Sequence, residues 1–361
     1  MAPRSLAVYV SSHGFGHATR ISEVVAGFLE RVAECAVHVR TTAPPWLFPA
    51  SEGRLRVHSV ATDVGMVQPH GLTIDFAATI ARLDELEARW DERLAAEAAW
   101  LDEVHAGLVL GDLPPLALAA AARAGLAGVG LANFSWDWIY GRYVERDPRF
   151  AVHAERAAAC YAAARRLYRL PFHAPMPVFS SIVDVPLIAR RCRLSRAEAR
   201  DRLGLPAAGP LVLLSFGGLG PPAIEVSRFA DLSRVSFVAT EAYAHAPPNL
   251  IYLERARLDY AMLLRASDVV VTKPGWGILV ASLVNAVRVL YTTREDFPET
   301  PVLVDALRAH ATAEPIAIED LVRGEIRDRL EALLARPVAE TELAADGAAR
   351  VAELLAQDIA A

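Results

Sequence analysis

Short apolar runs alternate with helical stretches along almost the whole chain, and they do so in two series. The first series contains LAVYVSS, AVHVRTT, LRVHSVA, GLVLGD and AGVGLANF, and the second contains PLVLLSFGG, VSFVATE, NLIYLE, DVVVTK and VRVLYTT. Most runs lack the two-residue alternation of half-exposed strands, as is typical of parallel strands covered on both faces. Helical patterns such as ATRISEVVAGFLERV and GILVASLVNA lie between them. The sequence therefore predicts two α/β domains, each built on a doubly wound parallel sheet.

A proline-rich segment, RLPFHAPMPVFSSIVDVP, separates the two series and shows no helical periodicity. We place the domain boundary within it, so that 1–184 forms the first domain and 185–340 the second. The alanine-rich end of the chain, 341–361, is predicted to be a terminal helix. A chain of 361 residues suits two domains of ordinary size.

Composition excludes several classes of protein. A formal charge of −6 argues against a nucleic-acid-binding surface, which needs clustered lysine and arginine. Charges interrupt every apolar run before the length of a membrane span, and the first run is too short for a secretion signal, so a cytoplasmic protein is expected. The three cysteines are widely spaced and form no CxxC pair, which indicates neither a disulfide framework nor a zinc site.

Ligands of parallel sheets bind beyond the carboxyl ends of the strands, and the loop SSHGFGHATR follows the first run. Gly14 and Gly16 give backbone freedom where amides could face a ligand, with a helix expected from about Ala18. The loop lacks the third glycine of a dinucleotide fingerprint and the Gly-Lys-Ser/Thr of a Walker loop. His13 and His17 remain as candidate proton acceptors near neutral pH; the alternative is that both only cap or fill the turn.

Further along the first series, polar groups follow two other runs. Asp112 ends GLVLGD, where it could orient a histidine, bind sugar hydroxyls, or cap the next helix. The segment NFSWDWIYGRYV gathers Asn133, Trp136 and Asp137. Aromatic planes beside amide and carboxylate groups suit a carbohydrate, and they equally suit the edge of a core.

In the second series, two glycine-containing loops follow strands. The amides of Gly217 and Gly218 in SFGGLGPP could approach a phosphate or a sugar, or the loop could be a simple tight connection. The motif KPGWG brings a cation next to a helix N-terminus, which suits a diphosphate, and its tryptophan could stack on a base or sugar or fill the core. The candidate residues of this motif are Lys273, Gly275, Trp276 and Gly277.

With these residues in view, the chain resembles the two-domain glycosyltransferases of the GT-B fold. More closely, it resembles the N-terminal glycosyltransferase-like half of the plant L-arabinokinases and their stand-alone bacterial relatives. The matching stretches run in order along the chain from Ser11 to Glu299: SSHGFGHATR, NFSWDWIY, LPFHAPMPVF, DVPLIARR, SFGG, KPGWG and REDFPE.

The resemblance implies two Rossmann-like domains facing across a cleft. It implies a nucleotide-sugar donor on the C-terminal domain, an acceptor on the N-terminal one, and a final helix that returns to the first domain. His17 corresponds to the base of inverting members, with His13 as a further candidate, and Glu299 to a group that contacts donor sugar hydroxyls. One position departs from the family pattern, because Ala281 stands where a glutamate usually holds the donor ribose. No metal or cofactor beyond the nucleotide sugar is implied.

The hypothesis from the sequence is an enzyme that transfers a hexosyl or pentosyl group from a nucleotide sugar to an unidentified acceptor, with no nucleic-acid partner. One alternative, motivated by Ala281, is a non-catalytic nucleotide-sugar-binding or regulatory protein. Another is a nucleotide-sugar epimerase or hydrolase, since one fold supports several chemistries. A weak peripheral membrane contact through exposed apolar helices also stays open.

Overall fold

The computed structural model describes residues 4–51, 53–69, 72–217, 223–293 and 296–360. The chain divides into two compact units: Met1–Val67, Ile74–Ile188 and Ala344–Ala361 form the first, and Gln68–Thr73 and Ala189–Leu343 form the second. The expected boundary at 184 thus falls inside the first unit, shortly before the point at which the chain leaves it.

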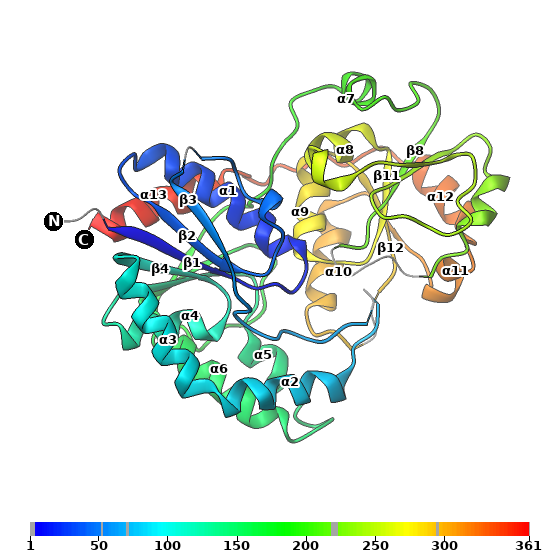
Figure 1. Cartoon of the computed structure of the whole chain (residues 1–361). Helices are drawn as coiled ribbons and strands as arrows, with labels where there is room; N and C mark the ends of the chain where they lie inside the picture. Colours follow the sequence, from blue (N-terminus) through cyan, green and yellow to red (C-terminus); the bar gives the residue numbers. More distant parts are fainter. Residues whose placement is uncertain (1–3, 52, 70–71, 218–222, 294–295, 361) are drawn as a thin grey trace. The chain divides into compact units, whose positions relative to one another are not determined.

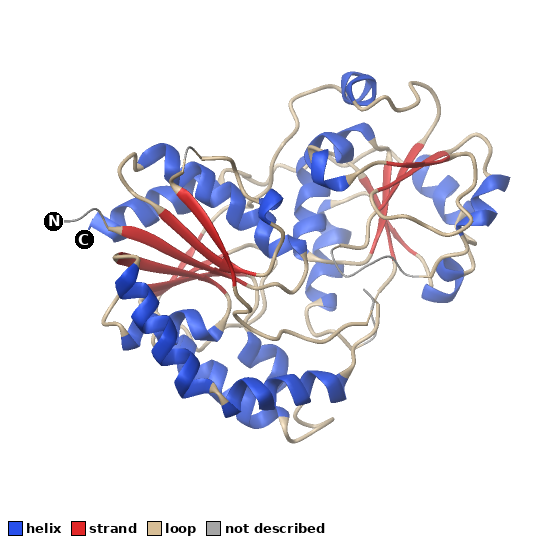
Figure 2. Ribbon diagram, in the orientation of Figure 1, coloured by secondary structure: helices blue, strands red, loops and turns tan. Residues whose placement is uncertain are grey.

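The first unit is built on a parallel sheet, drawn in red in Figure 2 together with that of the second unit. Within the described residues this sheet has seven strands in the order β3-β2-β1-β4-β5-β6-β7, and each pairing is parallel. The strands are β1 (Ser5–Val10), β2 (Val37–Thr41), β3 (Leu55–Ser59), β4 (Ala106–Asp112), β5 (Gly128–Ala132), β6 (Arg166–Arg169) and β7 (Ile182–Asp184).

Helices cover both faces of this sheet, so the central strands β1 and β5 are buried along their whole length. One face packs against α3 and α4, and α1 and α13 pack against each other on the other face (Figure 1). The helices of the unit are α1 (Phe15–Arg31), η1 (Pro45–Leu47), α2 (Phe76–Ala88), α3 (Trp90–Glu103), α4 (Pro115–Arg123), α5 (Trp136–Gly141), α6 (Phe150–Ala162) and α13 (Gly347–Ala360).

The second unit repeats this plan. Its described strands form a six-stranded parallel sheet in the order β10-β9-β8-β11-β12-β13. They are β8 (Leu211–Leu214), β9 (Ser236–Ala239), β10 (Leu250–Tyr252), β11 (Val269–Thr272), β12 (Arg288–Tyr291) and β13 (Ala313–Pro315). The helices are α7 (Arg196–Arg202), η2 (Val226–Asp231), η3 (Arg255–Arg257), α8 (Tyr260–Ala266), α9 (Trp276–Val284), α10 (Thr300–His310), α11 (Ile318–Val322) and α12 (Arg327–Leu334).

The structure corrects the sequence prediction at several elements. Strands β6, β7 and β13 were not expected, because they are three or four residues long and carry arginine, aspartate or proline in place of a continuous apolar run. Helix α1 begins at Phe15, before the expected start near Ala18. Gly14 makes this possible, since its φ of 88° turns the chain directly from β1 into the helix.

Both sheets share one topological property that places the candidate loops. In each sheet, the first strand lies between the second strand and the fourth. Later strands are therefore added on the opposite side of the first strand from the second and third, and the strand order reverses at this point. The carboxyl edge at such a reversal is where open α/β sheets bind their ligands. In the first unit this point lies between β1 and β4, and in the second between β8 and β11.

No helix among the described residues is both long enough and apolar enough to cross a bilayer.

The last helix, α13, is joined to the first unit by a short antiparallel bridge. The amide of Leu187 donates to the carbonyl of Ala344 at 3.0 Å, and the amide of Gly347 donates to the carbonyl of Leu187 at 3.0 Å. A Cβ on Gly347 would lie 2.2 Å from the carbonyl oxygen of Pro186. Only glycine lets the two backbones approach this closely.

Gly347→Ala is therefore expected to lower the free energy of unfolding by about 1–3 kcal/mol, the usual cost of overpacking against backbone that cannot move away. Gly141→Ala is the matched control, because a Cβ there meets nothing within 4 Å. Urea denaturation of both variants measures the difference. An unfolding free energy for Gly347→Ala equal to that of the control would contradict the tight contact.

Candidate functional site

A buried cluster of polar side chains occupies the carboxyl edge of the first sheet at its reversal point. Asp112, the last residue of β4, has no exposed surface, and its Oδ2 accepts a hydrogen bond from Nε of Arg20 at 2.7 Å. Nη2 of Arg20 donates to the other carboxylate oxygen, Oδ1. Nη1 of Arg20 donates to Oδ1 of Asn133, just after β5, at 2.8 Å. One arginine of α1 thus connects the ends of β4 and β5.

His17 lies on the same side of α1 as Arg20, one turn earlier, and joins this cluster. Its Nδ1 is 2.9 Å from Oδ1 of Asp112 and 3.0 Å from Nη2 of Arg20. An imidazole nitrogen cannot donate to the carboxylate and accept from the guanidinium at once. Only the tautomer with Nδ1–H donating to Asp112 leaves Nε2 unprotonated, and an unprotonated Nε2 is the atom that can take a proton.

Two opposing effects act on the Asp112 carboxyl. Burial by itself raises its pKa, but the positive charge of Arg20, the charge of His17 and the hydrogen bonds from both outweigh burial. The pKa of Asp112 therefore lies below its usual value, and the group is a carboxylate throughout the physiological range.

An aromatic wall borders this cluster. The His13 ring meets Trp136 edge to face at 5.5 Å between centroids, and Phe134 meets both Trp136, at 5.2 Å, and His17, at 5.9 Å. Gly65 closes the corner, since a Cβ at this glycine would lie 2.8 Å from Nδ1 of His13. The structure therefore brings together His13, His17, Asp112, Asn133 and Trp136, which the sequence had placed on separate loops.

A second carboxylate, Asp63, faces the same place and was missed in the sequence. The indole Nε1 of Trp136 donates to its Oδ2 at 3.1 Å. Burial raises the pKa of Asp63, although hydrogen bonds to Ser11 and Trp136 and the charge of His17 lower it in part. No motif marks this residue, because it lies on an irregular segment after β3, and only the chain's return toward β1 brings it here.

Arg20 was also missed, although it ends the quoted loop SSHGFGHATR. Its spacing of three residues from His17 is a signal that could have been used, because residues three apart share a helix face. Asp137 takes no part in the hydrogen bonds of the cluster described above. It is half-buried on α5, and its Oδ1 meets no hydrogen-bond partner among the described residues.

The glycines of the first loop have different roles in the backbone. Gly14 is the N-cap of α1, and a Cβ there would meet nothing within 4 Å, so its positive φ is the reason for glycine. Gly16 lies in the first turn of α1. The amides of this turn begin a helix at the edge of the sheet, as is suitable for a polar ligand.

In the second unit, the predicted loops flank the reversal point between β8 and β11. Ser215 extends β8, its amide donating to the carbonyl of Val271 at 3.0 Å, and its hydroxyl contacts the hydroxyl of half-buried Tyr260. Gly217 has a φ of 82°, a conformation that favours glycine. Gly218 lies outside the described residues.

The motif KPGWG turns β11 into α9. Gly275 is the N-cap of α9, and no side chain caps this helix start. Trp276 and Gly277 form the first turn, with the Trp276 side chain 5% exposed, so the indole fills the core. Lys273 is partly exposed, Glu299 is buried as the N-cap of α10, and Ala281 lies within α9.

Lys273 is distinguished by composition as well as position. The sequence has 37 lysine and arginine residues together, and Lys273 is the single lysine. A chain that uses arginine at its other basic positions has retained a compact, strongly hydrated ammonium here, which differs from a planar guanidinium in size and in hydrogen-bond geometry.

No cluster of three or more histidine, cysteine, aspartate or glutamate side chains in the described part of the chain is arranged to hold a metal ion.

Comparison with solved structures identifies the architecture. The glycotransferase of kitacinnamycin aligns with a TM-score of 0.65 and 17% identity, covering 100% of this chain and 96% of that protein. UGT89C1 of Arabidopsis thaliana aligns with a TM-score of 0.66 and 15% identity, covering 99% and 100%. The spinosyn forosaminyltransferase SpnP aligns with a TM-score of 0.55 and 13% identity, covering 100% and 95%. The chain has the GT-B fold. The predicted fold class is thereby confirmed, with one Rossmann-like GT-B sheet in each unit.

A curated relative matches this GT-B chain in sequence. L-arabinokinase of Arabidopsis thaliana is 35% identical over 336 residues, which covers 90% of this chain. The chain spans about a third, 32%, of the length of that protein. No model of a known protein family matches the sequence.

Asp63→Asn is expected to raise the thermal stability of the GT-B chain at pH 8, because the folded state no longer holds a carboxylate that burial disfavours. In the wild type, the unfolded chain releases this proton near a pKa of about 3.9 and the folded chain only at higher pH. The penalty therefore grows as the pH rises through this interval and is complete above it. Thermal unfolding between pH 8 and pH 4.5 should show the gain shrinking as the pH falls.

Asp112→Asn is the matched comparison variant, and it is expected to lower the thermal stability rather than raise it. It removes the carboxylate that Arg20 binds, and breaking a buried pair costs about 3–5 kcal/mol. Because the pKa of Asp112 is lowered in the folded state, its contribution is present above about pH 3.9 and is lost as the pH falls below that value. Equal destabilisation by the two variants would contradict the assignment.

Proposed function

We propose that this protein is a glycosyltransferase that moves a sugar from a nucleotide-sugar donor to an acceptor hydroxyl. The observation that carries this proposal is the imidazole of His17, positioned by a buried carboxylate at the reversal point of a GT-B sheet. The fold agrees, since the solved neighbours include glycosyltransferases.

The first unit supplies the base. With Nδ1–H donating to Asp112, Nε2 of His17 accepts the proton of the acceptor hydroxyl as its oxygen forms a bond to the anomeric carbon. The bond from that carbon to the diphosphate oxygen breaks, and a nucleoside diphosphate leaves with the electron pair. Asp112 and Arg20 act as positioning residues, because they hold the tautomer and the ring orientation without contacting the substrate.

The second unit supplies the diphosphate site. The uncapped amides at the start of α9 and the ammonium of Lys273 are favourable partners for negative charge on a departing diphosphate. Ala281 provides no carboxylate for a ribose, so the donor is held through its phosphates more than through its sugar. Uridine nucleotides are the first donors to test, because UGT89C1 was solved with UDP and with UDP-L-rhamnose.

The single lysine permits a direct binding measurement. Reductive methylation with ¹³C-formaldehyde places one labelled side chain in the molecule, at Lys273, beside the α-amino group. Titration with UDP and then with other nucleoside diphosphates should move the Lys273 signal. Lys273→Arg retains the charge and reports, by thermal shift, whether the site requires the compact ammonium. A Lys273 signal indifferent to every nucleoside diphosphate would overturn the assigned site.

His17→Ala is expected to reduce turnover by about a hundredfold or more, because it removes the base. The nucleotide-induced shift of the Lys273 signal should be unchanged, since the proposed contact of His17 is with the acceptor hydroxyl and not with the diphosphate. Thr19→Ala is the matched control on the same helix, because Thr19 is exposed and hydrogen-bonds only locally, to the carbonyl of Gly16.

Product analysis of donor turnover distinguishes the remaining chemistries. Nucleoside diphosphate release that depends on an added acceptor supports transfer. Release at the same rate without an acceptor would indicate a hydrolase instead, and nucleotide binding with no turnover for any acceptor would favour a regulatory protein.

A further inference from the structure

The strands β2 and β3, at one edge of the first sheet, carry a polar face that the proposed function does not use. Polar residues alternate with apolar ones: His38 and Arg40 on β2, and Arg56 and His58 on β3. The parallel register pairs His38 with Arg56 and Arg40 with His58, so all four side chains leave the same face of the sheet. This is the face on which Tyr9 of β1 lies beneath α3.

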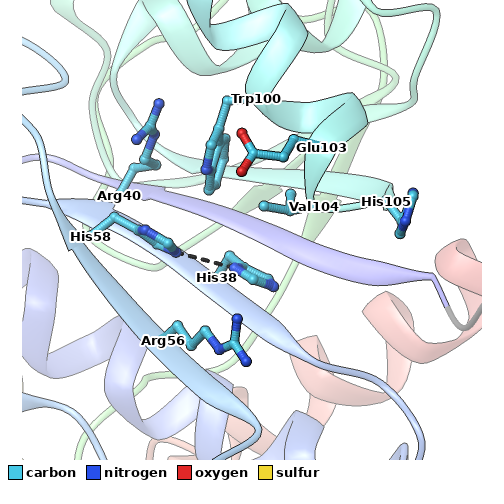
Figure 3. Close-up of a pocket in the computed structure, with 8 residues that line it drawn as sticks. All are labelled: His38, Arg40, Arg56, His58, Trp100, Glu103, Val104 and His105. Atoms are coloured by element: carbon cyan, nitrogen blue, oxygen red, sulfur yellow. Dashed lines mark hydrogen bonds between the residues drawn. The ribbon is translucent and has the colours of Figure 1, made fainter.

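These side chains line an open pocket on the first unit, shown in Figure 3. Trp100 and Glu103 at the end of α3 face the histidines and arginines of the strands. The pocket has a volume of about 480 Å³, in the usual range for small-molecule sites. Its lining consists of His38, Arg40, Arg56, His58, Trp100, Glu103, Val104 and His105.

One wall of the pocket is internally neutral and fixed. Arg40 donates two hydrogen bonds to Glu97, at 3.0 and 2.8 Å, and the same carboxylate accepts the Tyr9 hydroxyl at 2.8 Å. The Arg40 guanidinium lies over the Trp100 ring, 4.0 Å from its centroid. This wall therefore holds its shape without any ligand.

The floor of the pocket carries hydrogen-bond donors that, unlike Arg40, are not fully paired within the protein. Nδ1 of His38 and Nε2 of His58 are 3.1 Å apart, which leaves one further nitrogen on each ring. Arg56 is exposed, and no hydrogen bond or ion pair joins its guanidinium to another residue in the described part of the chain. The exposed residues Glu103 and His105 complete the groups that face the pair.

Burial, and to a smaller extent neighbouring positive charge, disfavours protonation of the two histidines. Burial lowers the pKa of His38 to about 4, with further lowering by His58 and Arg56. Burial also lowers the pKa of His58, together with the charges of Arg40 and Arg56, while Glu103 and Glu97 act weakly in the other direction. Both rings are therefore neutral at physiological pH, and an added anion would favour their protonation.

A bound cation fits this pocket less well than a bound anion. The Arg56 guanidinium opposes a positive charge, whereas that of Arg40 is neutralised by Glu97. Within the described residues no third histidine or carboxylate completes a metal site with the histidine pair. Arginine and imidazole donors converging on one cavity are the usual recognition elements for phosphate.

We propose that this pocket is a second ligand site, separate from the His17 cluster, that binds a small phosphate-bearing molecule. Arg56 provides the charged hydrogen bonds. One proton added to the His38–His58 pair makes both outward-facing ring nitrogens donors to the phosphate while the hydrogen bond between the rings is kept. Trp100 and Glu103 contact the remainder of the ligand.

Histidine-ring NMR with inorganic phosphate as the probe tests this site directly. His38→Gln and His58→Gln assign the two ring signals. At about pH 7.5 both rings are neutral without ligand, and phosphate should move the ring signals toward the protonated position. Arg56→Gln should weaken the effect at least about tenfold, because charged hydrogen bonds are lost. Arg82→Gln, an exposed arginine on α2, is the matched control and should leave it unchanged.

The outcomes separate this site from the one in the second unit. Lys273→Ala should not alter the histidine response, because Lys273 does not line this pocket. Ring signals that stay in place up to about 50 mM phosphate, far above the ~1 mM dissociation constant that a few charged hydrogen bonds provide, would overturn the proposal. An equal response in the wild type and Arg56→Gln would overturn it as well.

Discussion

The buried ion pair between Arg20 and Asp112 determines how the carboxyl edge of the first sheet is arranged. A carboxylate without exposed surface is stable only when it is paired and hydrogen-bonded, and Arg20 provides two donors to Asp112 and a third to Asn133. Helix α1 begins at Phe15, after the four residues that follow β1, and this places Arg20 within reach of both strand ends. The same helix brings His17, one turn earlier, against Asp112. The imidazole is therefore held by the carboxylate that pairs with Arg20.

The two carboxylates of this edge are held in opposite ways. Asp112 is stabilised as an anion by Arg20 and His17, whereas Asp63 lies half-buried beside Trp136 and desolvation raises its pKa. Pairs of titratable groups whose environments separate their pKa values are characteristic of sites that move protons. Ionised Asp112 stabilises the fold, whereas ionised Asp63 lowers its stability. Packing alone does not distinguish the two carboxylates.

The second unit presents a different kind of evidence, because its candidate groups are backbone amides and one cation. Helix α9 begins at Trp276 without a side-chain cap, and Lys273 lies three residues before that start. Lys273 is the single lysine of the sequence, and its compact ammonium differs in size and hydrogen-bond geometry from the arginines at the other basic positions. The polar face of β2 and β3 is a comparable departure, because edge strands in a helix-covered sheet need no cluster of histidine and arginine to fold.

The sequence by itself determined the two parallel sheets, since short apolar runs separated by helices can be buried on both faces in few other ways. It also predicted which loops lie at the carboxyl edges of the two sheets, because strand ends precede glycines at SSHGFGHATR and KPGWG. Only the tertiary structure decided that Arg20 neutralises Asp112, that Asp63 joins the site, and that His38 lies beside His58. These contacts join residues from 20 to 92 positions apart in the chain. They depend on strand order and helix register, and neither local propensity nor periodicity contains information about these.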